Sequence, residues 1–503
     1  MTAHEREPLG NLRSRVLHGI AWKVVSQVVV QLSRVVVAIV LARLLSPHDY
    51  GLAAMVLVFA ALIFIFSDLA FGAALVQRRS ISEQDRSTAF WMTFAGGLAF
   101  TLIGLALSGP IARLYGEPEV RPLFAALSLS FFVTALGTTQ KALLTREMDF
   151  RRLEVRLMVG TVAAAAAGIV VAAFGGGAWA IIAQQLVLAA VSTALLWLSS
   201  SWRPRLQFSV SSLRSMSGFT GNVLGTQILF YVSRSTDNFL IGRFLGSAAV
   251  GAYALAYNLV AVPLSRVGSP IQEVLFPVLS RLQDDRPALA SAWLRVNRLV
   301  AALCLPALLG LVIVAPEFVV VVLGRKWEAA IPVIQILAWA GLLQSLQRVN
   351  SSVLQACNRT GTLFRFSIVA STMNVTAFAV GLQWGIVGVA AAYALTNTFL
   401  QPFYTWLTAR TVGLSFASTM RSVSGVVQAS LLMAGGVFLT RALLLEEGVA
   451  DAASLAVCVV VGLTLIVPFM AWRAPDVVTE IRGVIRRKRP PGDPLAKAQP
   501  SQS

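Results

Sequence analysis

Residues 26–54 read SQVVVQLSRVVVAIVLARLLSPHDYGLAA, and residues 226–254 read TQILFYVSRSTDNFLIGRFLGSAAVGAYA. The two stretches align without a gap, and the matches include polar residues as well as apolar ones. The matched residues of the first stretch are Gln27, Ser33, Arg34, Arg43, Leu45, Gly51 and Ala54, and those of the second are Gln227, Ser233, Arg234, Arg243, Leu245, Gly251 and Ala254. Arginine is rare in or beside membrane spans, so two matched arginine pairs indicate an internal repeat.

Both copies of the repeat contain a long apolar run, and such runs recur along the whole chain. Hydrophobic residues make up 56% of the 503 residues, charged residues only 13%, and the mean hydropathy is +0.73. Roughly 20 apolar residues cross a bilayer as a helix. About fourteen runs of this kind predict an all-α, polytopic membrane protein. They fall near residues 18–42, 51–71, 88–109, 119–140, 157–174, 178–198, 218–240, 249–275, 297–322, 331–352, 363–382, 386–408, 423–443 and 452–472.

The repeat and the spans together predict the domain organisation. The repeat joins the first two spans to the seventh and eighth, which gives two parallel six-helix lobes around a central cavity, related by an axis normal to the membrane. The expected parts are a cytoplasmic segment 1–17 with no cleaved leader, a lobe 18–198, a cytoplasmic linker 199–217, a second lobe 218–408, two additional helices 423–472 and a basic amphipathic and disordered tail 473–503.

The charge of the chain gives its orientation. The net charge is +18, and the lysines and arginines gather in the loops on one side of the predicted spans. The positive-inside rule then predicts that both termini face the cytoplasm. The expected location is the bacterial plasma (inner) membrane. The basic residues are dispersed and lack aromatic stacking partners, so nucleic acid is not an expected partner. The three cysteines and three histidines do not cluster, so neither a metal nor a cofactor is expected.

Intramembrane arginines are the main candidates for binding a substrate. Arg34 lies about 22 Å along its helix from residue 19, within the outer half of the hydrocarbon layer. An arginine there costs about 2.5–3.5 kcal/mol, so it is expected to face a cavity or a partner. Arg234 is its counterpart in the repeat, and two such cations favour an anionic substrate. The alternative for Arg234 is an ion pair with Asp237, three residues later on the same helix.

Other polar residues within spans complete the candidate site. Gln27, Gln227 and Asn222 suit sugar hydroxyls, with hydrogen bonds between helices as the alternative. Asp237, Glu273 and Asp68 are candidates for coupling to an ion, although an interfacial cap is the alternative for Asp68. Pro263, Pro270 and Pro277 recur every seven residues on one helix face, which indicates either a hinge or a static kink.

Several segments resemble the polysaccharide exporter and Wzx-type flippase family of the MOP superfamily, and most closely its colanic acid and teichuronic acid exporter branch. They are LARLLSPHDYG, FSDLAFGAALVQRRSISEQDRSTAFW, ALLTREMDFRRLEV, DNFLIGRFLG, GAYALAYNLVAVP, VLFPVLSRLQDD and VVLGRKWEAAIPVIQILAWAG, within residues 15–410. The resemblance implies flipping of an undecaprenyl-diphosphate-linked oligosaccharide by alternating access. It also implies cations in the cavity and coupling to H⁺ or Na⁺, roles for which Arg34, Arg234, Arg266 and Asp237 are candidates.

The resemblance further implies membrane lipids and polysaccharide assembly enzymes as partners. Three alternatives stay open. A drug and toxin extruder would favour acidic residues for cationic substrates, and a lipid II flippase is a second relative. A polytopic polymerase or glycosyltransferase would need a sizeable outer loop, which these spans do not provide. A transporter without enzymatic activity is therefore the expected class.

Overall fold

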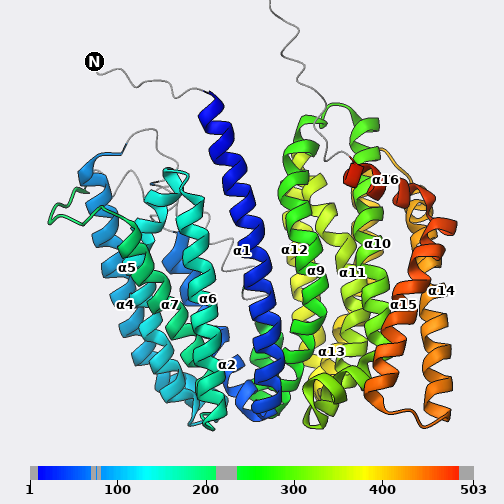
Figure 1. The fold of residues 1–503 in the computed structure, drawn as a ribbon, viewed down its shortest axis with the longest axis horizontal. Helices are drawn as coiled ribbons and strands as arrows, with labels where there is room; N and C mark the ends of the chain where they lie inside the picture. Colours follow the sequence, from blue (N-terminus) through cyan, green and yellow to red (C-terminus); the bar gives the residue numbers. More distant parts are fainter. Residues whose placement is uncertain (1–8, 70–74, 76–80, 211–230, 232–234, 487–503) are drawn as a thin grey trace, which may run out of the picture. The chain divides into compact units, whose positions relative to one another are not determined.

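The computed structural model describes residues 9–69, 75, 81–210, 231 and 235–486, and no β-strand occurs among them. The helices of the first half are α1 Leu9–Leu44, α2 Pro47–Leu69, α4 Glu83–Tyr115, α5 Val120–Arg146, α6 Phe150–Ala173 and α7 Trp179–Ser199 (Figure 1). Residues 235–245 are also helical. The later helices are α9 Ser247–Arg281, α10 Arg286–Phe318, α11 Ile331–Ala356, α12 Thr360–Gly381, α13 Gly385–Thr411, α14 Phe416–Glu446, α15 Asp451–Arg473 and α16 Pro475–Arg486.

These helices confirm the predicted fold class. Every expected span coincides with a helix except 218–240, most of which lies outside the described residues. Ten helices of the described part are long and apolar enough to cross a membrane. The chain is thus an all-α, multi-pass membrane protein, and the total of fourteen spans stays a prediction. Several helices extend beyond their apolar runs: α4, for example, covers Glu83–Tyr115 where the run covers only 88–109.

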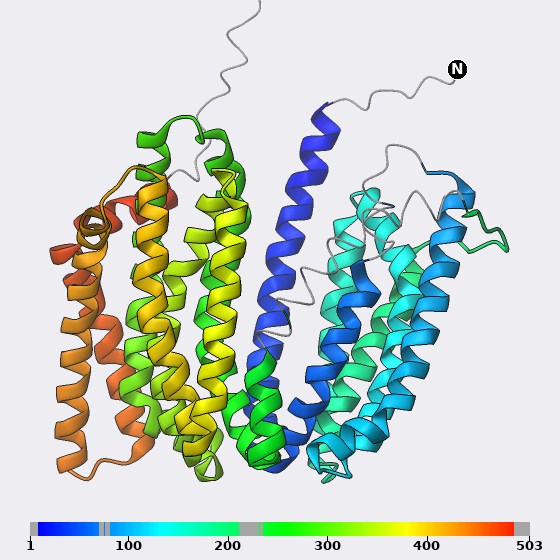
Figure 2. The same ribbon diagram turned by 180° about the vertical axis from the view of Figure 1, so that it is seen from behind.

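The helices divide into two compact units. Unit 1 comprises Met1–Leu255, Val322–Ala330 and Asn374–Val389, and unit 2 comprises Ala256–Val321, Ile331–Met373 and Ala390–Ser503. In unit 1, α4 packs on α5, α6 on α7 and α1 on α6; in unit 2, α14 packs on α15 and α10 on both α11 and α14 (Figures 1 and 2). The predicted division at the linker 199–217 stays a prediction.

Capping residues fix where several helices begin. Ser82 forms a capping box with Asp85 at the start of α4, and Gly116, with φ 74°, ends the same helix in the left-handed region. Asp149, Asp285 and Ser415 each accept a backbone N–H at the starts of α6, α10 and α14. These polar residues lie in the turns between apolar runs, and they satisfy backbone N–H groups in the first turns of the helices that follow.

Small residues let the helices approach closely. A Cβ atom added to Gly97 of α4 would lie 2.4 Å from the Cβ of Ala135 on α5, and one on Gly160 of α6 would lie 2.6 Å from Oγ of Ser192 on α7. Close approach of this kind is the main source of packing energy between membrane helices, because lipid tails are as apolar as the helices.

The segment Val322–Ala330 closes the C-terminal end of α1. Trp327 Nε1 donates to the carbonyl of Ala42 over 2.8 Å, and Lys326 Nζ donates to that of Arg43 over 2.7 Å. Arg43 Nε in turn donates to the carbonyl of Val322. The last carbonyls of a helix have no partner within it, so this segment supplies the donors that α1 lacks.

The first part of the predicted tail 473–503 is helical, and the basic amphipathic and disordered character of the whole tail stays a prediction. Residues 475–486 form the helix α16, and Val477 in this helix is buried. Arg298 of α10 forms ion pairs with Asp476 and Glu480 of α16, at 3.3 and 3.2 Å. The helix therefore packs on its own chain within unit 2. Residues 487–503, predicted to be disordered, lie outside the described residues.

Candidate functional site: a polar stripe on the first helix

Four polar side chains share one face of α1. Lys23, Gln27, Gln31 and Arg34 follow one another at spacings of four, four and three residues, which places them on one line along the helix. Lys23, Gln27 and Arg34 are exposed on unit 1, and Gln31 is half-buried. At 1.5 Å per residue the stripe is about 16 Å long. It therefore covers about half of the roughly 30 Å hydrocarbon thickness of a bilayer.

The other faces of α1 differ from this polar stripe. Val30, Val37 and Leu41 are buried within unit 1, where α1 packs on α6. Val28 and Leu32 lie on a third face and are exposed, at 53% and 61%, as expected for contact with lipid. At 100° per residue, the polar stripe lies directly beside the packed face, between it and the exposed apolar face.

The polar stripe keeps free hydrogen-bonding capacity. Within the described residues, neither Lys23 nor Arg34 forms an ion pair, and the buried Oε1 of Gln31 has no hydrogen-bond partner. A guanidinium and an ammonium group that lack partners need water or an anionic ligand. Chemically, the polar stripe offers two cations and two amides to a ligand that passes along α1.

Asp237, the first candidate for ion coupling, is buried in unit 1 with 4% exposure. The hydroxyl of Tyr253 donates to its Oδ2 over 3.2 Å, and the backbone N–H of Asn238 donates to its Oδ1 over 2.7 Å. Hydrogen bonds to a carboxylate stabilise its charged form. The structure thus gives Asp237 an enclosed, hydrogen-bonded position, and its role in coupling stays a prediction.

The remaining predicted site residues cannot be placed. Arg234, Gln227 and Asn222 lie outside the described residues. Six others lie in the helices α2 and α9, where the structure describes the backbone but not their side chains. They are Asp68, Pro263, Arg266, Pro270, Glu273 and Pro277. The helix α9 runs without interruption through its three prolines. Of the predicted substrate-binding residues, the structure places Gln27 and Arg34 on one helix face.

Sequence analysis missed two residues of the polar stripe and one buried ion pair. Lys23 and Gln31 could have been predicted to share this face, because they lie at helical spacing from Gln27 and Arg34. The missed pair is Glu317 of α10, 4% exposed, and Arg441 of α14, whose Nε donates to Glu317 Oε1 over 2.8 Å. Both lie inside predicted spans, so a charge within an apolar run was the signal that could have found them.

Comparisons with known proteins agree on the family. A family model described as "Polysaccharide biosynthesis protein" matches residues 40–332, more than half of the chain. The lipopolysaccharide biosynthesis protein WzxC of Escherichia coli (strain K12) is 30% identical over 78% of this chain and 81% of its own length. The teichuronic acid biosynthesis protein TuaB of Bacillus subtilis (strain 168) is 25% identical over 82% and 86%.

Solved structures agree on the fold. The lipid II flippase MurJ in an inward closed conformation has a TM-score of 0.73 at 14% identity, over 90% of this chain and 100% of that one. An inward-facing multidrug resistance MATE transporter of the MOP superfamily has a TM-score of 0.62 at 15% identity, over 80% and 95%. The predicted resemblance to polysaccharide exporters is thus confirmed, and the chain belongs to the polysaccharide biosynthesis protein family.

Proposed function

We propose that this protein flips an undecaprenyl-diphosphate-linked oligosaccharide across the bacterial plasma membrane by alternating access, without catalysing a chemical reaction. The single observation that carries the proposal is the polar stripe of α1, which exposes Arg34 in the middle of a membrane helix. The names of the relatives support it: one is a lipopolysaccharide biosynthesis protein, and another, ExoT of Rhizobium meliloti (strain 1021), is a succinoglycan biosynthesis transport protein.

The chemistry of the polar stripe fits this substrate. The diphosphate is anionic, and charge-assisted hydrogen bonds from Arg34 and Lys23 to phosphate oxygens are stronger than neutral ones. The amides of Gln27 and Gln31 can both donate to and accept from sugar hydroxyls. Exposure of a guanidinium to hydrocarbon costs several kcal/mol, so this face of α1 suits a wet path better than a lipid surface.

The proposal includes an orientation and a source of energy. The basic loops support termini in the cytoplasm. Asp237 is the best candidate for exchange with H⁺ or Na⁺, because it is a buried carboxylate with a tyrosine hydroxyl as its hydrogen-bond donor. Arg234 is the proposed counterpart of Arg34 in the second copy of the repeat. Membrane lipids and polysaccharide assembly enzymes are the proposed partners.

The test combines a deletion with variants of the polar stripe. In a strain that lacks the protein, lipid-linked oligosaccharide should accumulate on the cytoplasmic side of the membrane. Its orientation can be measured in spheroplasts with periodate, which does not cross the membrane and therefore oxidises only the outward-facing oligosaccharide. Arg34→Gln should slow outward movement about tenfold, as expected for one lost charge-assisted hydrogen bond. Arg325→Gln, which removes the same charge from an exposed turn, is the control. Normal orientation of the precursor in the deletion strain would refute the proposal.

A further inference from the structure

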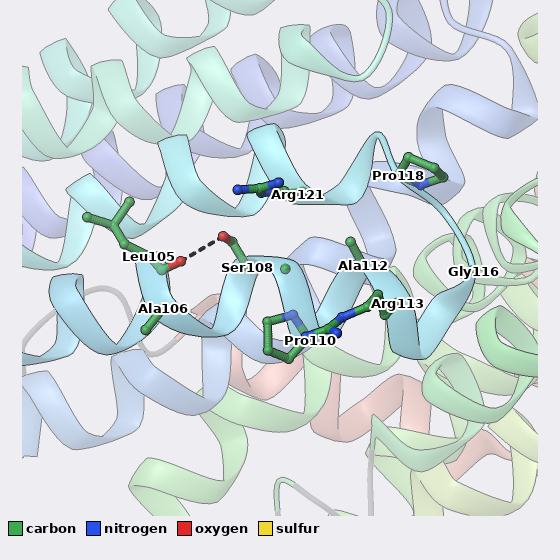
Figure 3. A pocket seen from close by; sticks show the side chains of 10 residues that line it. Leu105, Ala106, Ser108, Pro110, Ala112, Arg113, Gly116, Pro118 and Arg121 are labelled. Atoms are coloured by element: carbon green, nitrogen blue, oxygen red, sulfur yellow. Dashed lines mark hydrogen bonds between the residues drawn. The ribbon is translucent and has the colours of Figure 1, made fainter.

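An open pocket lies between the end of α4 and the start of α5, in unit 1. Its volume is about 770 Å³, and Figure 3 shows the residues that line it. Two lining residues are charged, Arg113 of α4 and Arg121 of α5, and both are exposed. Within the described residues, neither guanidinium group forms an ion pair or a hydrogen bond. Two guanidinium groups from facing helices favour an anion that accepts from both.

The depth of the pocket matches a membrane surface. With 33 residues, α4 is about 50 Å long, which exceeds the roughly 30 Å of bilayer hydrocarbon. Its apolar run ends at Gly109, and Arg113 lies four residues, or about 6 Å, beyond that point. Arg121 is the second residue of α5. Both guanidinium groups therefore lie at the level where lipid phosphates are found.

The surroundings of the pocket are apolar on the lipid side. Leu102, Ile103 and Leu107 of α4 are exposed, and so is Leu105, which also lines the pocket. Exposed side chains of this kind on a membrane helix contact acyl chains. A ligand that fills the pocket is therefore amphiphilic, with a phosphate beside the arginines and acyl or prenyl chains beside the leucines.

The backbone of α4 adds an acceptor to the pocket. Pro110 has no N–H, so the carbonyl of Ala106, four residues earlier, lacks its helical donor. The hydroxyl of Ser108 donates to the carbonyl of Leu105 over 2.7 Å, so it is not free to donate to a ligand. The arginines are thus the donors of the pocket, and the Ala106 carbonyl can accept from a hydroxyl of the headgroup.

The nearby acids do not neutralise the arginines. Glu117 and Glu119 lie in the turn between the two helices, but neither lines the pocket. Glu119 instead lies 3.8 Å from Nε2 of His48. The lining of the pocket therefore carries two positive charges and no negative one.

We propose that Arg113 and Arg121 bind the phosphate group of a membrane lipid at this end of α4. This proposal rests on the proposed function in one respect only: the orientation given there places the pocket in the outer leaflet. A phospholipid headgroup and the phosphate of an undecaprenyl carrier share this chemistry. Either one is held by two guanidinium forks at the surface of the first lobe, away from the polar stripe of α1.

The test measures lipid binding to the purified full-length protein in detergent, by native mass spectrometry. The probes are phosphatidylglycerol and undecaprenyl phosphate, with diacylglycerol, which has no phosphate, as the reference lipid. Arg113→Gln and Arg121→Gln should each weaken binding of a phosphate probe about tenfold. Arg325→Gln removes one exposed arginine outside the pocket and should leave binding unchanged. Arg113→Lys and Arg121→Lys keep the charge without the fork and should weaken binding less than the glutamine variants.

The outcomes separate the two lipid sources. If the glutamine variants bind both probes more weakly, the pocket is a general site for lipid phosphate. If they bind only undecaprenyl phosphate more weakly, the pocket is a site for the carrier. Binding by the glutamine variants that equals that of Arg325→Gln, for both probes, overturns the proposal. The assay requires neither transport nor a known orientation, so it can fail or succeed independently of the proposed function.

Discussion

The ion pair between Glu317 and Arg441 gives a quantitative test of the packing in unit 2. Arg441 Nε lies 2.8 Å from Glu317 Oε1, and the two side chains are only 22% and 4% exposed. Removing one member of a buried pair leaves an uncompensated charge, which costs about 3–5 kcal/mol. Replacing both members by apolar residues removes both charges together and is often close to neutral.

We therefore expect strong coupling between substitutions at the two positions. Glu317→Leu and Arg441→Leu should each lower the free energy of unfolding by about 3 kcal/mol or more, whereas the double variant should lose about 1 kcal/mol or less. The free energies can be measured by unfolding the purified protein in mixed micelles with increasing sodium dodecyl sulfate. The reversed pair, Glu317→Arg with Arg441→Glu, should be more stable than either single leucine variant.

The control for this double-mutant comparison is a pair of exposed charged residues. Arg325 and Glu328 lie three residues apart in a short 3₁₀ turn, and both side chains are exposed. Leucine at either position should change stability by about 0.5 kcal/mol or less, with no coupling. If the losses at Glu317 and Arg441 simply add in the double variant, the pair does not act as a buried unit, and the reasoning is wrong.

Three further predictions follow from single residues. Gly251→Ala should destabilise the protein strongly, since the new Cβ would lie 2.0 Å from the carbonyl oxygen of Pro47, whereas Gly435→Ala, with nothing within 4 Å, should be tolerated; thermal unfolding of the two variants checks this. Trp327→Phe should cost about 1–3 kcal/mol in the same assay, because the buried Ala42 carbonyl loses its donor, while Trp384→Phe, at 67% exposure, should cost little. Burial raises the pKa of the Cys357 thiol, so its reaction with maleimide should be slow near neutral pH and should still accelerate above pH ~9.5, where an ordinary thiol is almost fully ionised; a rate that has levelled off by that pH would contradict this.

The fold was predictable from the sequence because its signals are local. Runs of apolar residues depend only on neighbouring residues and on the thickness of the bilayer, so the helix α4 was predicted although it continues beyond its run 88–109 to Tyr115. The same is true of α16, in which the apolar residues Val477, Ile481 and Val484 recur at helical spacing. Helix ends were less predictable, because capping side chains and polar turns extend helices beyond the hydrocarbon.

The candidate site was only partly predictable. Arg34 and Gln27 stood out as polar residues in an apolar run, and helical spacing could have added Lys23 and Gln31. The partner of Glu317 could not be found this way, because Arg441 lies 124 residues later and meets it only through the packing of α10 on α14. Likewise, no local pattern shows that Trp327 donates to the end of α1, 285 residues earlier.

The internal repeat has a structural consequence that explains two of its glycines. A Cβ on Gly51 would lie 1.8 Å from the carbonyl oxygen of Ser247, and one on Gly251 would lie 2.0 Å from that of Pro47. Pro47 corresponds to Ser247 in the repeat as Gly51 does to Gly251, so the same contact is made twice, as a local two-fold axis requires. Because each glycine packs on the backbone of the other copy, a side chain at either position would push apart the first turns of α2 and α9. The two copies can therefore keep this crossing only while both glycines are present, which is why the repeat remains visible at these positions although the apolar residues around them differ.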